Sequence, residues 1–244
     1  MSIYTIIAGV NGVGKSSLTG LLKGERSDLG IIIDVDAISA KVGSNIIGGK
    51  QAIRLIDDCL DKKVNFTQET TLSGKRIFAT LDKARSNGYY IRMYYVALRS
   101  LDESYLRIEN RVRKGGHDIP KDDVSKRYSK RYDDVIKVLP FCDEVHFYDN
   151  DNGFIDVAEY KNGEIVIKQH TEWIEQLKNR FSIMSDISDD FYYKEVNSAQ
   201  FMVLSQSELL FDKTENDGRI IVKVDKSDKD TLEDLLSQIK SITI

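Results

Sequence analysis

The amino-acid sequence predicts an α/β fold, in which helices cover both faces of a mainly parallel sheet, followed by a small α+β C-terminal extension. Three observations support this prediction. Short β-prone apolar runs alternate with segments whose apolar residues recur at helical spacing. Residues 30–34 (GIIID) are apolar up to the last residue, as expected of a strand covered on both faces. After Asn150 the alternation ends, and Asn162-Gly163 marks a hairpin turn.

The first part of the chain is predicted to hold five strands and the helices between them. We expect strands at residues 4–8, 30–34, 66–69, 89–98 and 143–149. We expect helices at residues 17–22, 50–63, 74–86, 102–114 and 121–138. A hairpin over 154–168 and a short helix over 171–181, which holds the sole Trp173, complete a first domain of residues 1–181.

The rest of the chain, residues 182–244, is predicted to be a separate acidic extension. It carries seven Lys and Arg residues against thirteen Asp and Glu residues. Residues 185–190 are predicted to form a linker. Strand-like pieces at 200–211 and 219–224, around a turn at 216–218, precede a helix at 228–241. This composition suits a packing cap or a contact surface equally well.

Composition excludes several classes of protein. The chain has 244 residues and a net charge of -4, which argues against a protein whose main task is to bind nucleic acid. No apolar run approaches the roughly 20 residues of a membrane span, and the N-terminus lacks the features of a secretory signal. Cys59 and Cys142 are too few for a disulfide framework. We therefore expect a cytoplasmic protein.

Residues 9–16 (GVNGVGKS) match the phosphate-binding loop G-x4-G-K-[ST] between a predicted strand and a predicted helix. Glycines let backbone N–H groups turn toward phosphate oxygens, and the helix N-terminus adds partial positive charge. Lys15 would reach the β- and γ-phosphates, and the Ser16 hydroxyl would ligate Mg²⁺. The motif predicts a P-loop NTPase that uses ATP and Mg²⁺. The residues expected to bind the nucleotide are Gly9, Asn11, Gly12, Val13, Gly14, Lys15, Ser16 and Ser17.

The remaining motifs favour a small-molecule kinase, with a nucleotide-kinase-like fold. The sequence lacks the N-K-x-D motif of GTPases and matches the L-S-G-G-Q motif of ABC-type ATPases only in part. Asp36 follows the second strand, at the sheet edge where ligands gather in open α/β folds. It is our candidate for the carboxylate that accepts the proton of the substrate hydroxyl. Asp34 is a second candidate near Mg²⁺, acting through water. For either residue the alternative is a helix N-cap.

A second polar cluster ends the third predicted strand at the same sheet edge. It combines one acid with three hydroxyls, a set that suits a hydroxyl-rich substrate such as a sugar. The alternative is a capping segment for the next helix. Together with Asp36, the predicted substrate contacts are Glu69, Thr70, Thr71 and Ser73.

Residues 107–137 are basic, with ten Lys and Arg residues against six Asp and Glu residues. An arginine can stabilise the charge on a transferred phosphoryl group and contribute about 10³–10⁵ in rate. We predict this role for Arg107, Arg111 and Arg127. The alternative is a solvated pair of helices joined by surface salt bridges. The predicted catalytic residues are therefore Lys15, Asp36, Arg107, Arg111 and Arg127.

These segments resemble the zeta toxin family of P-loop kinases. The resemblance rests on IAGVNGVGKSS, DVDAI, QETTLSG and RIENRVRKGGHDIP, and it covers roughly residues 3–180. It implies that ATP and Mg²⁺ are used to phosphorylate UDP-N-acetylglucosamine at its 3′-hydroxyl, and that a separate antitoxin chain blocks the nucleotide site. It also implies that Asp36 is the base, that Glu69 contacts the substrate or organises the metal, and that arginines hold ATP phosphates. The family's Asn-Pro before the acid is here Asp34-Val35, which can alter the substrate pocket.

The sequence leaves three alternatives open. A kinase of this type could act on another sugar nucleotide or small hydroxyl compound. An ATP-binding interaction module would bind the nucleotide without phosphorylating a small molecule, and the acidic extension would be its docking surface. A polynucleotide kinase would act on RNA or DNA ends with a steep salt dependence, although the net charge of -4 disfavours it.

Overall fold

The computed structural model describes residues 1–116, 118–185, 191–216 and 219–240. Contacts between Cα atoms divide the chain into two compact units, Met1–Ile174 and Glu175–Ile244. The division lies inside helix α7 (Glu172–Ser185), whereas the sequence analysis placed a boundary between residues 181 and 182 of the same helix.

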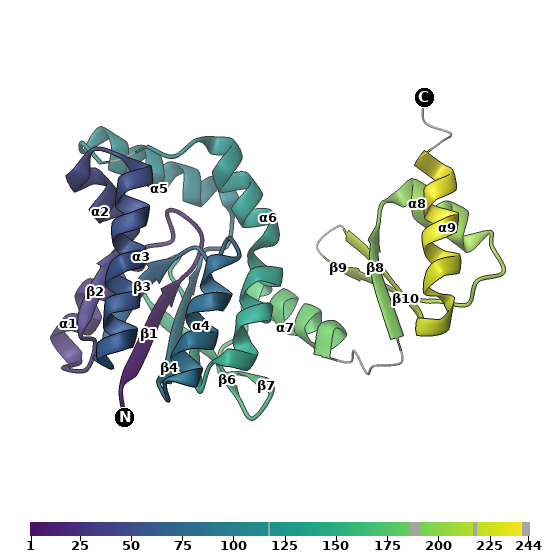
Figure 1. The fold of residues 1–244 in the computed structure, drawn as a ribbon. Helices are drawn as coiled ribbons and strands as arrows, with labels where there is room; N and C mark the ends of the chain where they lie inside the picture. Colours follow the sequence, from purple (N-terminus) through teal and green to yellow (C-terminus); the bar gives the residue numbers. More distant parts are fainter. Residues whose placement is uncertain (117, 186–190, 217–218, 241–244) are drawn as a thin grey trace. The chain divides into compact units, whose positions relative to one another are not determined.

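The described residues of the first unit form a seven-stranded sheet, which Figure 1 shows with the helices around it. The strand order is β2-β3-β1-β4-β5-β6-β7; β1 to β5 pair in parallel, and β6 and β7 add antiparallel strands. The bounds are β1 (Ile3–Ala8), β2 (Ile31–Asp34), β3 (Phe66–Thr70), β4 (Tyr90–Ala97), β5 (Glu144–Asp149), β6 (Ile155–Lys161) and β7 (Glu164–Ile167). The predicted α/β class with a mainly parallel sheet is confirmed.

Helices connect the parallel strands and pack against the sheet. They are α1 (Lys15–Glu25), α2 (Val35–Val42), α3 (Asn45–Lys62), α4 (Arg76–Ser86), α5 (Leu101–Arg113) and α6 (Lys121–Val138), with a 3-10 turn η1 (Leu139–Phe141) after α6. Helices α3 and α4 lie side by side in Figure 1. No helix in the described part of the chain is both long and apolar enough to cross a membrane.

The loop that follows β1 is anchored in the core of the first unit. Ile7 of β1, Val10 and Val13 of the loop, and Leu18 and Leu22 of α1 belong to one buried cluster. Burial of a side chain of this size contributes about 1.5–3 kcal/mol. The apolar residues within the loop therefore fix the path of the glycines between them.

The start of the chain's second strand-and-helix pair differs from the prediction. Helix α2 begins directly after β2, because the Asp34 carboxylate caps it by accepting hydrogen bonds from two N–H groups of the first turn. Helix α3 begins at Asn45, before the predicted start at residue 50. Strand β2 is an edge strand, so Ile31 is 50% exposed, and the expectation that both faces of this strand are covered is wrong there.

The second unit contains an antiparallel sheet with the strand order β8-β10-β9. Its elements are β8 (Phe191–Val196), α8 (Ser198–Ser205), β9 (Asp212–Asn216), β10 (Arg219–Asp225), the 3-10 turn η2 (Lys226–Asp228) and α9 (Lys229–Lys240). Leu204, Val222 and Leu232 belong to a hydrophobic core of this unit. The residues after α7 thus form an α+β unit with a core of its own.

The strand expected at residues 200–211 is wrong, because its first half belongs to α8. Asn197 and Gln200 form a capping box that starts this helix, and Leu204 then packs into the core. The expected strand at 219–224 and helix at 228–241 correspond to β10 and α9. Residues 186–190 of the expected linker, residues 217–218 of the expected turn, and residue 241 lie outside the described residues.

Candidate active site

Two glycines of the loop between β1 and α1 lie directly against the backbone of neighbouring elements. Gly9 has φ +140° and Gly12 has φ +83°, in the region of φ that side chains disfavour. A Cβ added to Gly9 would lie 2.2 Å from the backbone oxygen of Val96, and one added to Gly12 would lie 2.6 Å from that of Ser104. Strand β4 and helix α5 therefore press on the loop backbone and direct it to the N-terminus of α1.

Lys15 is the first residue of α1, and its side chain turns back over the loop. Its Nζ donates hydrogen bonds to the backbone oxygens of Gly9 at 2.9 Å and Val10 at 3.0 Å. Burial lowers the pKa of the Lys15 ammonium, although three neighbouring carboxylates, led by Glu69, favour its charged form. The cation is thus held at the loop among acids of opposite charge.

Glu69 lies beside the loop because β3 pairs in parallel with β1, with Glu69 opposite Ile7. Its Oε2 accepts a hydrogen bond from the Ser16 hydroxyl at 2.7 Å, and its Oε1 accepts one from the Thr19 hydroxyl at 2.6 Å. Burial raises the pKa of the Glu69 carboxyl, against the effect of these two hydrogen bonds. Glu69 is therefore tied to the serine that would ligate Mg²⁺.

Asp34 and Asp36 lie at the end of β2, on the same edge of the sheet. Asp34 Oδ1 accepts hydrogen bonds from the backbone nitrogens of Asp36 at 2.9 Å and Ala37 at 3.1 Å, so Asp34 is the N-cap of α2. The Asp36 side chain is exposed in the first turn of the helix and favours the charged form of Lys15. The capping alternative thus applies to Asp34, and Asp36 faces the cleft described next.

These groups line a single cleft of about 600 Å³, which is within the usual size of a small-molecule site. The phosphate-binding loop, the ends of β2 and β3, and helices α2, α5 and α6 form its walls. Within the described residues, no group of three or more His, Cys, Asp or Glu side chains could hold a metal ion alone. A hydroxyl such as that of Ser16, completed by phosphate oxygens and water, fits the usual way in which Mg²⁺ is held with a nucleotide.

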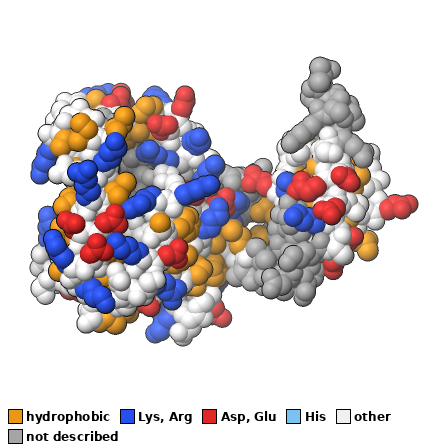
Figure 2. All heavy atoms as spheres, viewed as in Figure 1, with side chains coloured by type: hydrophobic (Ala, Val, Ile, Leu, Met, Phe, Trp, Pro, Cys, Tyr) orange, Lys and Arg blue, Asp and Glu red, His pale blue; other side chains and the backbone are white. Residues whose placement is uncertain are grey.

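Three arginines reach the cleft from α5 and α6: Arg107, Arg111 and Arg127. Arg107 donates to the backbone oxygens of Asn150 at 2.7 Å and Asp151 at 3.3 Å. Arg127 donates to Asn11 Oδ1 in the phosphate-binding loop at 2.6 Å. Figure 2 shows Lys and Arg side chains spread over the visible face of the first unit, with Asp and Glu side chains among them. The basic helices thus do not form a purely solvated face.

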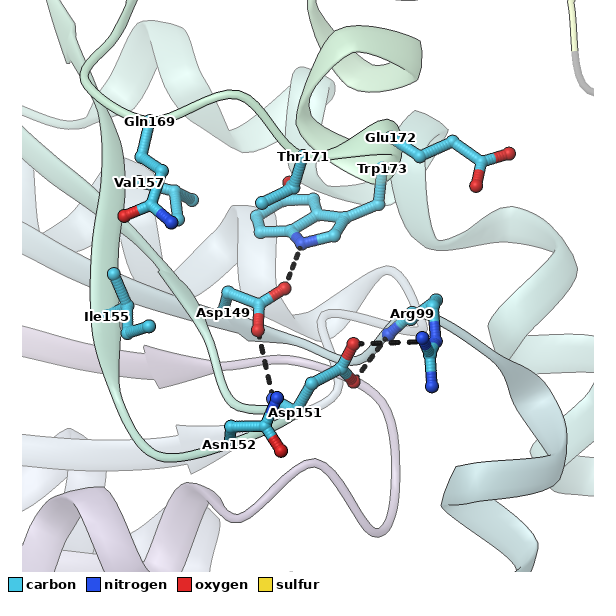
Figure 3. A pocket seen from close by; sticks show the side chains of 10 residues that line it. All are labelled: Arg99, Asp149, Asp151, Asn152, Ile155, Val157, Gln169, Thr171, Glu172 and Trp173. Carbon is cyan, nitrogen blue, oxygen red and sulfur yellow. Dashed lines mark hydrogen bonds and ion pairs between the residues drawn. The ribbon is translucent and has the colours of Figure 1, made fainter.

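A second, smaller cavity of about 210 Å³ is lined in part by the loop that follows β5. Figure 3 shows Trp173 and Asp149 pointing toward each other in its wall. Trp173 Nε1 donates to Asp149 Oδ2 at 2.8 Å, and the Asp151 N–H donates to Asp149 Oδ1 at 2.9 Å. Between these two aspartates, Asn150 Nδ2 donates to the backbone oxygen of Val13 at 2.8 Å, so this loop is also bonded to the phosphate-binding loop.

Comparison with known proteins shows what this chain is similar to. A family model described as "Zeta toxin" matches residues 48–154, which include β3, β4, β5, α5 and α6. The chain thus resembles the zeta toxin family over less than half of its length. It is also 32% identical over 126 residues to an uncharacterized protein of Haemophilus influenzae, a match that covers 49% of this chain and 88% of that protein.

The fold of this chain recurs in solved structures of low sequence identity. A structure of the PezAT chromosomal toxin–antitoxin system of Streptococcus pneumoniae matches with a TM-score of 0.51 and 16% identity, covering 76% of this chain and 86% of that chain. A structure of AvrRxo1-ORF1:-ORF2 with ATP matches with a TM-score of 0.57 and 14% identity, covering 73% of this chain and 64% of that one, less than two thirds. These likenesses support the P-loop kinase fold.

Most of the predicted site residues meet in the larger cleft. Two predicted nucleotide-binding residues do not line it: Gly9 lies under Lys15, and the Val13 side chain is in the hydrophobic core. The predicted residues that line the cleft are Asn11, Gly12, Gly14, Lys15, Ser16, Ser17, Asp34, Asp36, Glu69, Thr70, Thr71, Ser73, Arg107, Arg111 and Arg127.

The hydroxyls after β3 are engaged in a local turn. Thr70 Oγ1 accepts from the Leu72 N–H at 3.0 Å, and the hydroxyls of Thr71 and Ser73 share a hydrogen bond of 2.7 Å. Helix α4 then begins after Lys75 without a side-chain cap, so the capping alternative for this segment is wrong. The cluster instead presents its polar atoms at the rim of the cleft.

Several residues that line the cleft carry no functional motif in the sequence. Gln68 accepts a hydrogen bond from the Tyr4 hydroxyl and lies one residue before Glu69 in β3. The residues of α2 that line the cleft do so because the helix begins directly after its Asp34 cap, and their residue types gave no indication of it. These lining residues are Val35, Ala37, Ala40, Gln68 and Ile108.

Proposed function

We propose that this protein transfers the γ-phosphoryl group of ATP to a hydroxyl of a sugar nucleotide, with UDP-N-acetylglucosamine as the first candidate. The similarity of residues 48–154 to the zeta toxin family and the kinase fold support a phosphotransferase. The observation that carries the proposal is the shared cleft, in which a phosphate-binding loop faces Asp36 and three arginines. A donor and an acceptor that are both anionic would meet there.

The donor would be bound by backbone N–H groups of the loop, the N-terminus of α1 and Lys15. Binding of phosphate would draw the Lys15 ammonium from the backbone oxygens of Gly9 and Val10, since phosphate is the stronger acceptor. Ser16, oriented by Glu69, would hold Mg²⁺. When bound, Mg²⁺ would offset the negative charge of the β- and γ-phosphates.

The acceptor would lie between α2 and the hydroxyl cluster after β3. Its hydroxyl oxygen forms the new bond to the γ-phosphorus, its proton passes to the Asp36 carboxylate, and the bond to the β–γ bridging oxygen breaks to release ADP. Arg111 and Arg127 would stabilise charge on the moving phosphoryl group from the opposite wall. Arg107 would act from the loop that it holds at Asn150.

The decisive experiment is incubation with γ-labelled ATP, Mg²⁺ and a panel of UDP-sugars, with products identified by mass spectrometry. We expect one phosphorylated UDP-sugar from the wild-type protein. Asp36→Asn should lower turnover by about 10²–10⁴, the usual contribution of a general base, with ATP affinity retained. ATP binding without any transfer would instead support an interaction module. Transfer to RNA or DNA ends would support a polynucleotide kinase.

We also propose a separate antitoxin chain as the partner of this protein, which would be cytoplasmic. The support is the fold shared with the PezAT structure, which is described as a toxin–antitoxin system. The proposal predicts that expression of the wild-type chain arrests bacterial growth and that Asp36→Asn relieves the arrest. Equal growth arrest by both forms would contradict a toxicity that depends on phosphoryl transfer.

A further inference from the structure

Helix α2 touches α3 at a point where backbone meets backbone. Ser39 is buried in the middle of α2, and it packs against Gly48 near the start of α3. A Cβ added to Gly48 would lie 2.3 Å from Ser39 Oγ, 2.5 Å from Ser39 Cα and 2.8 Å from the Ser39 backbone nitrogen. Two of these three atoms are backbone, so rotation of a side chain cannot relieve the overlap.

The same short helix carries Asp36. Asp36, Ala37 and Ala40 line the cleft, and their spacing puts them on one face of α2. Ser39 projects about 100° away from that face, toward α3. Because α2 has only eight residues, a force on Ser39 moves the whole helix. The distance between α2 and α3 therefore sets the position of the Asp36 carboxylate.

We propose that Gly48 is a positioning residue for phosphoryl transfer: by lacking a side chain, it lets α2 approach α3 and so places Asp36 at the acceptor hydroxyl. This inference rests on the proposed function. To bring a Cβ from 2.5 Å to an ordinary carbon–carbon contact, α2 would have to move by about 1 Å. A misplacement of about 1 Å can lower a rate by roughly 10²-fold.

The chain supplies a matched control at the next position. Gly49 lies in the same helix, and a Cβ added to it would meet no atom within 4 Å. Replacement of either glycine by alanine favours the helix to a similar degree. Any difference between Gly48→Ala and Gly49→Ala therefore reports the contact with Ser39.

The test compares steady-state transfer by the wild type, Gly48→Ala and Gly49→Ala. We expect Gly48→Ala to lower kcat by roughly 10²-fold, with ATP affinity within about twofold of the wild type. Gly49→Ala should retain the wild-type kcat. Equal kcat values for the two variants, or a loss confined to ATP affinity, would overturn the proposal.

Two further measurements separate the possible failures. If Gly48→Ala is unfolded by circular dichroism, Ser39→Val adds bulk to the same contact from the α2 side, and a folded Ser39→Val protein with wild-type kcat would overturn the proposal. If the wild type transfers phosphate to no acceptor, the proposed function fails instead. Crystal structures of Gly48→Ala and Gly49→Ala then still test whether α2 is displaced in the first variant alone.

Discussion

The Ser16 hydroxyl donates a 2.7 Å hydrogen bond to the Glu69 carboxylate, across 53 positions of sequence. The bond joins the residue expected to ligate Mg²⁺ to the end of the neighbouring strand. Glu69 is 7% exposed, and its carboxylate also accepts a hydrogen bond from Thr19, so the orientation of the carboxylate is fixed from two sides. Glu69 therefore belongs to the nucleotide side of the cleft as much as to the acceptor side.

Replacing Glu69 with glutamine should weaken transfer by about 10–100-fold, as is usual for a group that orients a metal ligand. The amide keeps the shape of the side chain but loses its charge, so the requirement for Mg²⁺ should rise more than the KM for the acceptor. Titration of activity with Mg²⁺ measures this. Glu164→Gln, at an exposed position on β7 at the far edge of the sheet, is the control. An unchanged Mg²⁺ requirement in Glu69→Gln would contradict the assignment.

The difference in unfolding free energy between the wild type and Glu69→Gln should depend on pH, with a definite sign. Burial raises the pKa of Glu69, so the folded protein holds this proton more tightly than the unfolded chain. Its stabilising contribution is present below the unfolded pKa, about 4.3, and is lost as pH rises through the raised value. As pH rises across this window, the unfolding free energy of Glu69→Gln should therefore increase relative to that of the wild type. Urea unfolding at a series of pH values checks the sign.

Lys15→Met should lower the transfer activity without lowering the stability of the protein. Burial lowers the pKa of the Lys15 ammonium, so keeping it charged near neutral pH disfavours the folded state. Methionine keeps much of the length of the side chain without the charge. We expect transfer to fall by at least about 10²–10³, an equal or higher Tm without nucleotide, and a smaller rise of Tm on addition of ATP and Mg²⁺. A Tm several degrees lower would show instead that Lys15 mainly anchors the loop.

Arg127→Ala should lower kcat strongly, because this side chain spans from α6 to Asn11 in the phosphate-binding loop. An arginine that stabilises the transferred group contributes about 10³–10⁵ in rate. Arg127→Lys should recover only part of the loss, since lysine lacks the planar fork of donors. The control is Arg113→Ala on α5, an exposed residue that pairs with Glu109 on the surface. A loss of equal size in the control would indicate a general effect of surface charge.

The sequence was sufficient to predict which functional groups lie together at one edge of the sheet. The loop motif and the acids after two successive strands could be placed in one cleft, since parallel strands end at the same edge. The bond from Arg127 to Asn11 joins residues 116 positions apart, and no local pattern records it. The contact of Gly48 with Ser39 was equally hidden, because it depends on the angle between two helices. The roles of Asn150 and Trp173 could not be predicted either, because Asn150 bonds to the phosphate-binding loop and Trp173 to the end of β5, and neither takes part in the chemistry.

The last prediction concerns Trp173, which supports the phosphate-binding loop indirectly, through Asp149 and Asn150. Its indole donates to the buried Asp149, and the next residue, Asn150, donates to Val13. Trp173→Phe leaves one oxygen of Asp149 without this donor, which should lower the unfolding free energy by about 1–3 kcal/mol. Since the loop loses support, ATP affinity should fall as well. Urea unfolding and ATP titration measure the two effects, with Gln169→Ala in the same cavity wall as the control. Lower stability with unchanged ATP affinity would show that Asn150 holds its place without the indole.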